Sequence, residues 1–462
     1  MWEGVLLSLL ATNLYALAAI RLHRWSQRQT LKGMQQAAAS CGLHAVESSA
    51  PPARRRLRLT ARAEPLDIQI ELYRSSTPSF RITVVVPGPP GFSSVKIVRE
   101  VERPRGAREV EIGDVPFDSA FYIQGPTRLL HALLDAEARH LLISANAESQ
   151  LEIAGGELRA GVHRYQIAGI LRLLLEVGQR FAQPLDVTKR LAENARLDPD
   201  AGVRLSNLLL LVREDPGDPV TLEVLRAACA DPSPEIRLRA AQELGAEGRA
   251  ILLELAKSEG NDPWSARAVS ALGCDLPFDL AATILNVALR RRRHLTARAC
   301  LETFGRSGNA EAVHLLAKVL AREEGDLATA AALALGATGS PAAEPPLLLV
   351  LWHASTEVLI AAASALGDVG SPAAVLPLKE ASERAANDQD LRRAIRQAIA
   401  RIQARLPGAS PGQLSLAGAE AGQLSLVPGE AGQLSLAADS AGQLSLPPAE
   451  GGELSLSGGE DA

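Results

Sequence analysis

The strongest concentration of charge in the sequence is a basic run, Arg290 to Arg293, followed by His294. Guanidinium groups in succession could hold an acidic protein partner or the phosphates of a nucleic acid. The run also precedes a repeated helical unit, and arginines at a solvated helix C-terminus are favoured by the helix dipole. We therefore name Arg290, Arg291, Arg292 and Arg293 as candidate binding residues, with the solvated helix end as the alternative.

Other residue types that carry chemistry lack the spacing that chemistry needs. The sequence has no phosphate-binding G-x-x-x-x-G-K-[ST] loop, no G-x-S-x-G elbow and no zinc-spaced Cys/His cluster. The cysteines form no C-x-x-C pair and are interpreted as reduced thiols packed as small apolar residues. They are Cys41, Cys229, Cys274 and Cys300. We predict no catalytic residues, no metal site and no cofactor.

Asp114 and Asp118 stand close enough in sequence to form a carboxylate pair. An aspartate in a turn and an aspartate that caps a helix or lies in a loop explain the two residues better.

The composition predicts helices packed through small side chains. Of 462 residues, 47% are apolar but only 3% are aromatic, so Ala, Leu and Val must form the core. All seven charged residues after Leu406 are acidic, and without them the formal charge of −5 becomes about +2. A near-neutral body argues against nucleic acid as a partner.

A small-x-x-x-(Leu/Phe)-Gly pattern recurs five times at a nearly regular interval. A repeat every ~30 residues predicts stacked helix pairs. The small residue lets helices approach, the large one fills the core between repeats, and glycine is expected to end the first helix in the left-handed conformation. The glycines are Gly245, Gly273, Gly305, Gly336 and Gly367, and the small residues are Ala240, Ala268, Cys300, Ala331 and Ala362.

These repeats resemble the HEAT family, an armadillo-like α-solenoid, and in particular the bacterial HEAT repeats related to phycocyanobilin lyases. The best matches are residues 236–245 and 361–370, and helix starts are expected at Ser233, Ser340 and Ser371, each followed by proline. The resemblance implies a protein-binding scaffold. Di-iron hydroxylases of this family use His-Glu dipeptides as ligands, but none of the eight histidines precedes a glutamate. A HEAT-type enzyme or a nucleic-acid-associated protein is the alternative function.

Between Arg56 and Val162 apolar residues alternate with polar ones, which is typical of strands. Pro126 is expected to begin a helix that continues to about Leu142. The stretch from Glu111 to Phe121 resembles an uncharacterised bacterial domain that often stands between an N-terminal anchor and a helical repeat array. Strands are expected near residues 57–61, 68–72, 81–86, 95–98, 110–112, 121–123, 151–153 and 158–162.

The N-terminus carries an uncharged apolar run from Val5 to Ile20, about 24 Å long as a helix against a hydrocarbon layer of ~30 Å. Glu3 precedes the run, and Arg21, Arg24 and Arg28 follow it. The positive-inside rule then predicts an uncleaved single-pass anchor in the inner membrane, with the bulk of the chain facing the cytoplasm. A helix docked on the protein or lying on the membrane surface is the alternative.

The C-terminal region repeats a pentapeptide, Gly412 to Leu416, with a ten-residue period: three more copies are identical, and a last one has Glu453 in place of glutamine. Low apolar content and abundant Gly, Ala, Ser and Pro predict a disordered acidic tail. Gln-Leu-Ser-Leu resembles the bacterial sliding-clamp-binding motif without its final aromatic or leucine residue. We name Gln413, Leu414 and Leu416 as candidate binding residues, with a non-specific spacer as the alternative.

The sequence thus predicts a mainly α-helical protein with four parts. Its function is predicted to be a membrane-tethered protein-interaction scaffold for an unknown protein partner, and not an enzyme. The parts are a membrane-anchor helix with its basic flank at 1–28, a smaller strand-rich α+β domain at 29–163, a HEAT-type α-solenoid at 164–405 and the tail at 406–462.

Overall fold

The computed structural model describes residues 21–405, except 23–24, 27, 44, 50–57, 75–77, 104–108 and 386–387. Four strands in the tail, at 414–416, 424–426, 435–436 and 444–445, are also described. The chain divides between Leu244 and Gly245 into two compact units, and each is described by itself. The four predicted part boundaries stay a prediction.

An antiparallel sheet forms the core of the first unit, as the period-two alternation predicts. Its strand order is β1-β2-β3-β4-β8-β7-β5-β6. Along β3, Leu66, Ile68 and Ile70 are buried on the face that the helices cover. The strands are β1 Ala45–Ser49, β2 Arg58–Ala63, β3 Leu66–Arg74, β4 Pro78–Val85, β5 Lys96–Arg99, β6 Phe121–Gln124, β7 Gln150–Ala154 and β8 Glu157–His163.

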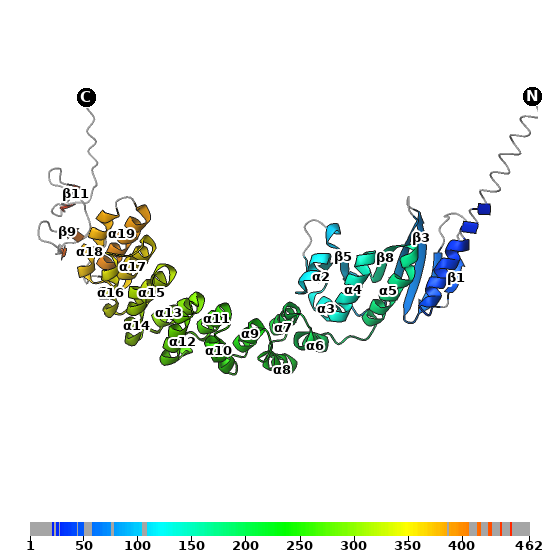
Figure 1. Cartoon of the computed structure of the whole chain (residues 1–462), viewed down its shortest axis with the longest axis horizontal. Helices are drawn as coiled ribbons and strands as arrows, with labels where there is room; N and C mark the ends of the chain where they lie inside the picture. The colour runs from blue at the N-terminus through cyan, green and yellow to red at the C-terminus, as the bar shows by residue number, and fades with distance from the viewer. Residues whose placement is uncertain are drawn as a thin grey trace, which may run out of the picture. The chain divides into compact units, whose positions relative to one another are not determined.

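Helices cover this sheet and continue beyond it (Figure 1). The long helix α5 packs on β3, β4 and β8 and buries Leu171 and Leu174, while helical residues 28–40 add Met34 and Ala38 to the same core. The helices of the first unit after residue 114 are α2 Val115–Ala120, α3 Thr127–Leu133, α4 Ala136–Glu148, α5 Ile167–Phe181, α6 Val187–Leu197, α7 Ala201–Glu214, α8 Pro219–Ala228 and α9 Pro234–Glu243.

Two local predictions in this unit are wrong. The single helix expected from Pro126 to Leu142 is divided into α3 and α4, because the Asp135 carboxylate accepts a hydrogen bond from the Ala138 amide at 3.0 Å and caps a new helix. No strand forms at residues 110–112, although the Val110 amide donates to the Ile123 carbonyl at 2.9 Å.

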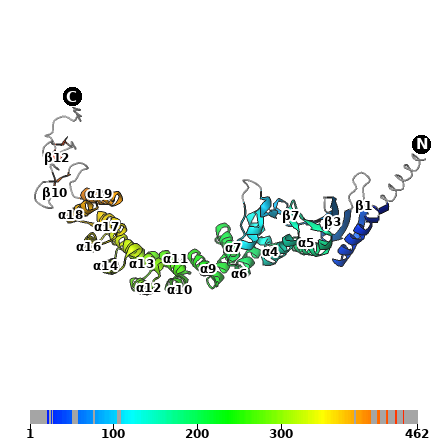
Figure 2. The same ribbon diagram turned by 45° about the horizontal axis from the view of Figure 1, so that its top comes forward.

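The second unit is a stack of helix pairs. First helices α11, α13, α15, α17 and α19 pack on one another in succession, and second helices α10, α12, α14, α16 and α18 lie along the other side (Figures 1 and 2). The bounds are α10 Arg249–Lys257, α11 Asp262–Leu272, α12 Phe278–Arg290, α13 His294–Ser307, α14 Ala310–Arg322, α15 Gly325–Ala337, α16 Glu344–Val350, α17 Thr356–Val369, α18 Val375–Arg384 and α19 Gln389–Ala404.

The predicted small positions of the repeat are confirmed: all five side chains are fully buried, Cys300 among them. The Ser-Pro helix starts are also confirmed. Ser340 and Ser371 each accept a hydrogen bond from the amide two residues later, at 3.3 and 3.2 Å, and Ser233 stands at the N-cap of α9. Cys274, in contrast, is exposed, so its prediction as a packed thiol is wrong.

The glycines of the repeat have two different roles, where one was expected. Gly245 and Gly273 have φ of 56° and 50° at helix ends. Gly305, Gly336 and Gly367 lie inside helices, where a Cβ atom would come within 2.9, 2.7 and 3.1 Å of backbone atoms of the next first helix. These three glycines therefore let successive helices touch, and the prediction that they end a helix is wrong.

The predicted inner-membrane localisation is contradicted. Among the described residues, no helix combines the length and the apolar character that crossing a membrane requires. The proposed anchor, residues 5–20, lies outside the described residues.

Most of the tail predicted to be disordered also lies outside the described residues. Where the tail is described, β9 Leu414–Leu416 pairs antiparallel with β10 Leu424–Leu426, and β11 Ser435–Leu436 pairs with β12 Leu444–Ser445.

Candidate functional site

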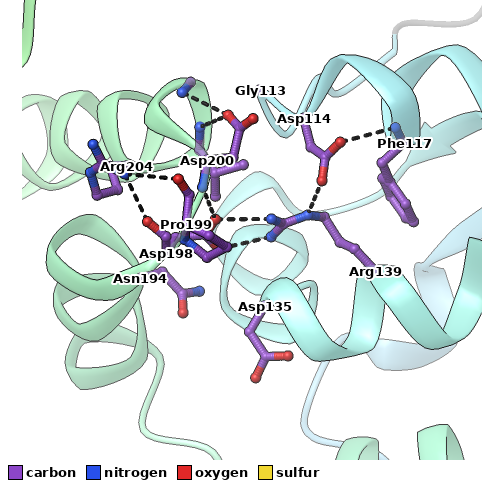
Figure 3. Close-up of polar contacts among 12 residues, drawn as sticks. Gly113, Asp114, Phe117, Asp135, Arg139, Asn194, Asp198, Pro199, Asp200 and Arg204 are labelled. Carbon is purple, nitrogen blue, oxygen red and sulfur yellow. Dashed lines mark hydrogen bonds and ion pairs between the residues drawn. The ribbon is translucent and has the colours of Figure 1, made fainter. Parts of the chain in front are cut away.

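A buried charge network joins the strand-rich part of the first unit to its first repeat helices. Its centre is Arg139 on α4, whose side chain is only 3% exposed. Both terminal nitrogens of Arg139 donate to the carboxylate of Asp198 at 2.9 Å, and Nε donates to Asp114 Oδ2 at 2.7 Å (Figure 3). Two carboxylates therefore compensate one guanidinium that has no access to water.

The network continues one repeat further through Arg204 on α7. Arg204 donates to the carbonyl of Asp198 at 2.9 Å and binds the Asp231 carboxylate through two hydrogen bonds of 2.8 and 2.9 Å. Burial alone would raise the pKa of Asp231, but the Arg204 guanidinium and the Ser233 amide outweigh it and hold this pKa below its ordinary value.

The sequence carried a signal for this network that we did not use. The Asp-Pro dipeptide at Asp198 recurs one repeat later at Asp231, and Arg204 and Arg237 follow the two aspartates at the same spacing. An Asp-Pro dipeptide with a downstream arginine therefore marks equivalent positions in successive repeats.

Asp114 and Asp118 each bind backbone amides of the turn and helix around them. The Asp114 carboxylate accepts from the Phe117 amide at 3.1 Å and caps α2, besides binding Arg139. Asp118 accepts from the amides of Ile112 and Gly113 at 3.0 and 2.9 Å. The turn and capping interpretation is confirmed.

A cavity of about 690 Å³ lies beside this network, within the first unit. His131 lines it, is 4% exposed and has no partner for Nδ1 among the described residues. Burial lowers the pKa of His131 to about 4, against a hydrogen bond with the backbone of Glu111 that raises it, so the imidazole is neutral at pH 7. Glu109, Glu111, Thr127, Ser206, Arg213, Arg239 and Glu243 supply the other polar groups of the lining.

The basic run of the second unit is divided by the fold. Arg290 ends α12, and Arg290, Arg291 and Arg292 are exposed, in agreement with a solvated helix end. Arg293 is buried: its Nη2 donates to Thr296 Oγ1 at 3.2 Å, and its Nε lies 3.8 Å from Asp262 Oδ1. Whether any of the four binds a partner stays a prediction.

A surface that the sequence interpretation missed lies at the edge of the second unit. We call it the turn edge: residues 258–262, 290–295, 322–326, 351–356, 384–385 and 388–389, where a second helix leads into the next first helix. Trp352 is 47% exposed there, and the guanidinium carbon of Arg384 lies 4.1 Å from the centre of its ring. Arg384 also donates to the Leu351 carbonyl at 3.2 Å, which fixes the pair.

Cavities of about 650 and 630 Å³ lie along this part of the turn edge. The first lies between residues 320–328 and 350–358, and the second between residues 351–359 and 381–391. Thr356 lines both of them. The two cavities are therefore adjacent. Trp352 lines neither of them, but its chain neighbours Leu351 and His353 line the second and the first cavity, respectively.

The structure describes little of the three candidate binding residues in the tail. Gln413 lies outside the described residues, and Leu414 and Leu416 are described only as backbone of β9. In the part of the chain that the structure covers, no group of three or more His, Cys, Asp or Glu side chains could hold a metal ion.

Comparison with known proteins supports the repeat assignment. Residues 316–400 match the family of HEAT repeats. No curated protein matches the chain. A solved structure, human deoxyhypusine hydroxylase in complex with glycerol, is similar at 16% identity with a TM-score of 0.23, over 47% of this chain and 96% of that chain. At this score the likeness carries no argument about fold or activity. Residues 316–400 fall within the stacked helices α14 to α19, so this part of the chain is similar to HEAT repeats in both sequence and helix arrangement.

Proposed function

We propose that the chain is a protein-interaction scaffold and that its turn edge holds a protein partner around Trp352. The observation that carries the proposal is the exposed Trp352 ring, stacked by Arg384, in a turn whose neighbouring residues line two cavities of about 650 and 630 Å³. The partner is unknown.

The residue types at this position favour its use as a binding site. Trp and Arg are enriched among the residues that carry most of the binding energy at protein interfaces, and they act best beside pockets that receive partner side chains. The hydrogen bond from Arg384 to Leu351 orders the pair before binding, which reduces the entropy lost on association. A repeat array also leaves a long surface free, because each repeat buries only its contacts with neighbouring repeats.

Several finer expectations remain part of this proposal. They are the absence of catalytic activity, the kinship of the repeats with bacterial phycocyanobilin lyases, and the resemblance of residues 111–121 to an uncharacterised bacterial domain. The residues of the repeat pattern support the kinship.

The test compares two tryptophans that each have a guanidinium over the ring; Trp352 is exposed and Trp264 is partly buried in α11. Trp264 also has a guanidinium over its ring, that of Arg267 at 4.5 Å, so Trp264→Ala is the matched control for Trp352→Ala. Proteins captured from native lysate by the immobilised full-length chain are quantified by mass spectrometry. We expect a partner retained by the original chain and by Trp264→Ala, and reduced at least about tenfold with Trp352→Ala, equivalent to about 1.4 kcal/mol. Equal capture by all three chains contradicts the proposal.

A further inference from the structure

The turn between α12 and α13 has more positive charge than its surroundings neutralise. Arg292 has no ion-pair partner among the described residues, and Arg290 only approaches the Asn286 carbonyl with its Nε, at 3.3 Å. Arg291 lies 3.6 Å from Glu259, with both side chains mostly exposed. Only Arg293 is compensated inside the fold, by Asp262. The outer face of this turn is therefore a basic surface open to an acidic partner.

Arg292 also has a backbone conformation that arginine disfavours. Its φ is 55°, and it is the only described residue other than glycine with a positive φ. The turn closes through hydrogen bonds from the Arg293 amide to the Ala288 carbonyl and from the Arg292 amide to the Leu289 carbonyl, the arrangement in which glycine is the usual residue. Local folding would favour glycine here, so an arginine at this position points to a use outside the turn.

The chain itself contains an acidic segment that complements this surface. No Lys or Arg follows Arg405, whereas seven acids do, spread over the ten-residue repeats. We propose that this acidic tail docks on the turn formed by Arg290, Arg291 and Arg292 of the same chain. The acids are Glu420, Glu430, Asp439, Glu450, Glu453, Glu460 and Asp461.

The length of the tail and its covalent attachment to α19 favour the tail over a separate acidic partner. Three steps of about 8–10 Å separate the packed first helices α13 and α19, and the tail leaves from the end of α19, about 24 Å along the helix from the edge where the turn lies, so the distance to be spanned is roughly 35–40 Å. A flexible chain of about 45 residues has a root-mean-square span of roughly 34–40 Å, and the β9–β10 and β11–β12 pairs shorten it, so the acids from Glu450 onward are the ones whose reach matches the turn. The tether gives an effective concentration of about millimolar order, and several similar acids can exchange at one site.

The surroundings of the turn limit where the tail docks. Leu295 is 51% exposed beside the arginines and offers an apolar contact for the leucines of the repeats. The next turn along the edge carries Glu323, Glu324 and Asp326, which repel the same tail. Docking is therefore confined to one turn of the edge.

Hydrogen exchange of the full-length chain tests the contact from both sides. In the first arm the seven tail acids are changed to Gln or Asn, which leaves the sequence of the turn intact. We expect amides of residues 290–295 to exchange at least about threefold faster in this variant, and the difference to disappear in about 0.5 M salt, because exposed charges are screened. Equal exchange in the two chains overturns the proposal.

In the second arm the readout is the tail from Glu450 onward. The variant Arg290→Ala with Arg292→Gly removes two charges without threatening the fold, since glycine suits the φ of 55°. The matched control, Arg393→Ala with Arg396→Ala, removes two exposed arginines from α19, closer to the tail. We expect faster tail exchange in the first variant only. Equal effects of both pairs indicate non-specific charge attraction and overturn the proposal.

Two further outcomes separate other occupants. Protection of the turn that grows with protein concentration means that a second copy supplies the tail, and overturns the contact within one chain. Protection by a single-stranded oligonucleotide, with no effect of the tail acids, identifies a nucleic-acid site instead. The proposal is supported if protection of the turn does not depend on protein concentration and is lost when the tail acids are neutralised. These measurements need no other protein, so they do not depend on the function proposed for Trp352.

Discussion

Replacing Arg139 by alanine is expected to destabilise the first unit by about 3–5 kcal/mol, the usual cost of removing one partner of a buried ion pair. The Asp198 side chain is 1% exposed and would lose both of its hydrogen bonds from the guanidinium. The Leu134 carbonyl, which accepts from Arg139 Nη1 at 2.9 Å, loses a partner as well. Asp114 is less affected, because it is partly exposed and can recruit water.

Hydrogen exchange followed by mass spectrometry can measure this loss within the first unit. For amides of α4 and α6 that exchange only when the unit unfolds, a loss of about 3–5 kcal/mol means roughly 150- to 5,000-fold faster exchange. The matched control is Arg128→Ala, which removes a half-buried guanidinium that pairs with Glu214 and Asp215. Such pairs contribute about 1 kcal/mol or less, so exchange should change by no more than about fivefold.

A double variant separates lost charge compensation from lost packing. Arg139→Met together with Asp198→Leu leaves no unpaired buried charge, and should recover most of the stability that Arg139→Ala loses. If Arg139→Ala accelerates exchange no more than Arg128→Ala does, the buried network does not hold the strand-rich part to the repeat helices, and our reasoning is refuted.

Three other predictions concern single residues. Burial lowers the pKa of His131 to about 4 in the folded state, against about 6.5 when unfolded, so the unfolded state takes up the proton first. The free energy of unfolding of the first unit should therefore fall by roughly 3 kcal/mol as pH falls from about 6.5 to about 4. In urea titrations, His131→Gln should make this free energy less dependent on pH. An unchanged pH dependence contradicts the lowered pKa of His131. Gly336→Ala should lower the thermal midpoint, because the new methyl group clashes with Ala365 at a cost of about 1–3 kcal/mol. This clash should outweigh the higher helix propensity of alanine. A raised midpoint would show that the contact can relax. Burial raises the pKa of Cys300 to about 12, whereas Cys274 is exposed. A thiol reagent at about pH 8 should therefore label Cys274 in the native protein and Cys300 only after unfolding. Mass spectrometry that finds Cys300 labelled in the native protein would contradict this prediction.

Features that depend on one segment of sequence could be predicted. Period-two alternation located most of the strands, because a half-buried strand needs only its own pattern. The recurring small residue located the buried face of the first helices, since a stacked helix must leave room for its neighbour. Ser233, Ser340 and Ser371 marked helix starts, because a cap acts over less than one helical turn.

Features that depend on a partner one repeat away were missed. Gly336 resembles a helix-ending glycine until its contact with Ala365, on the next first helix, is known. Arg293 looks like the other three arginines of its run, but Asp262, at the start of the preceding first helix, determines that it is buried. Trp352 is marked as a surface feature only by Arg384, at the end of the following second helix. Comparing residues at the repeat interval, rather than along one helix, would have indicated all three.

The bond from Arg139 to Asp198 has a consequence for how this protein can be divided or recombined. A fragment that begins at residue 164, where the sequence predicts the array to start, would retain Asp198 without the guanidinium that compensates it. The strand-rich part thus terminates the solenoid at its beginning, as a dedicated capping repeat does elsewhere. Transferring the repeats to another protein without α4 would transplant a buried, uncompensated charge. The two parts must therefore be moved together if Asp198 is to stay compensated.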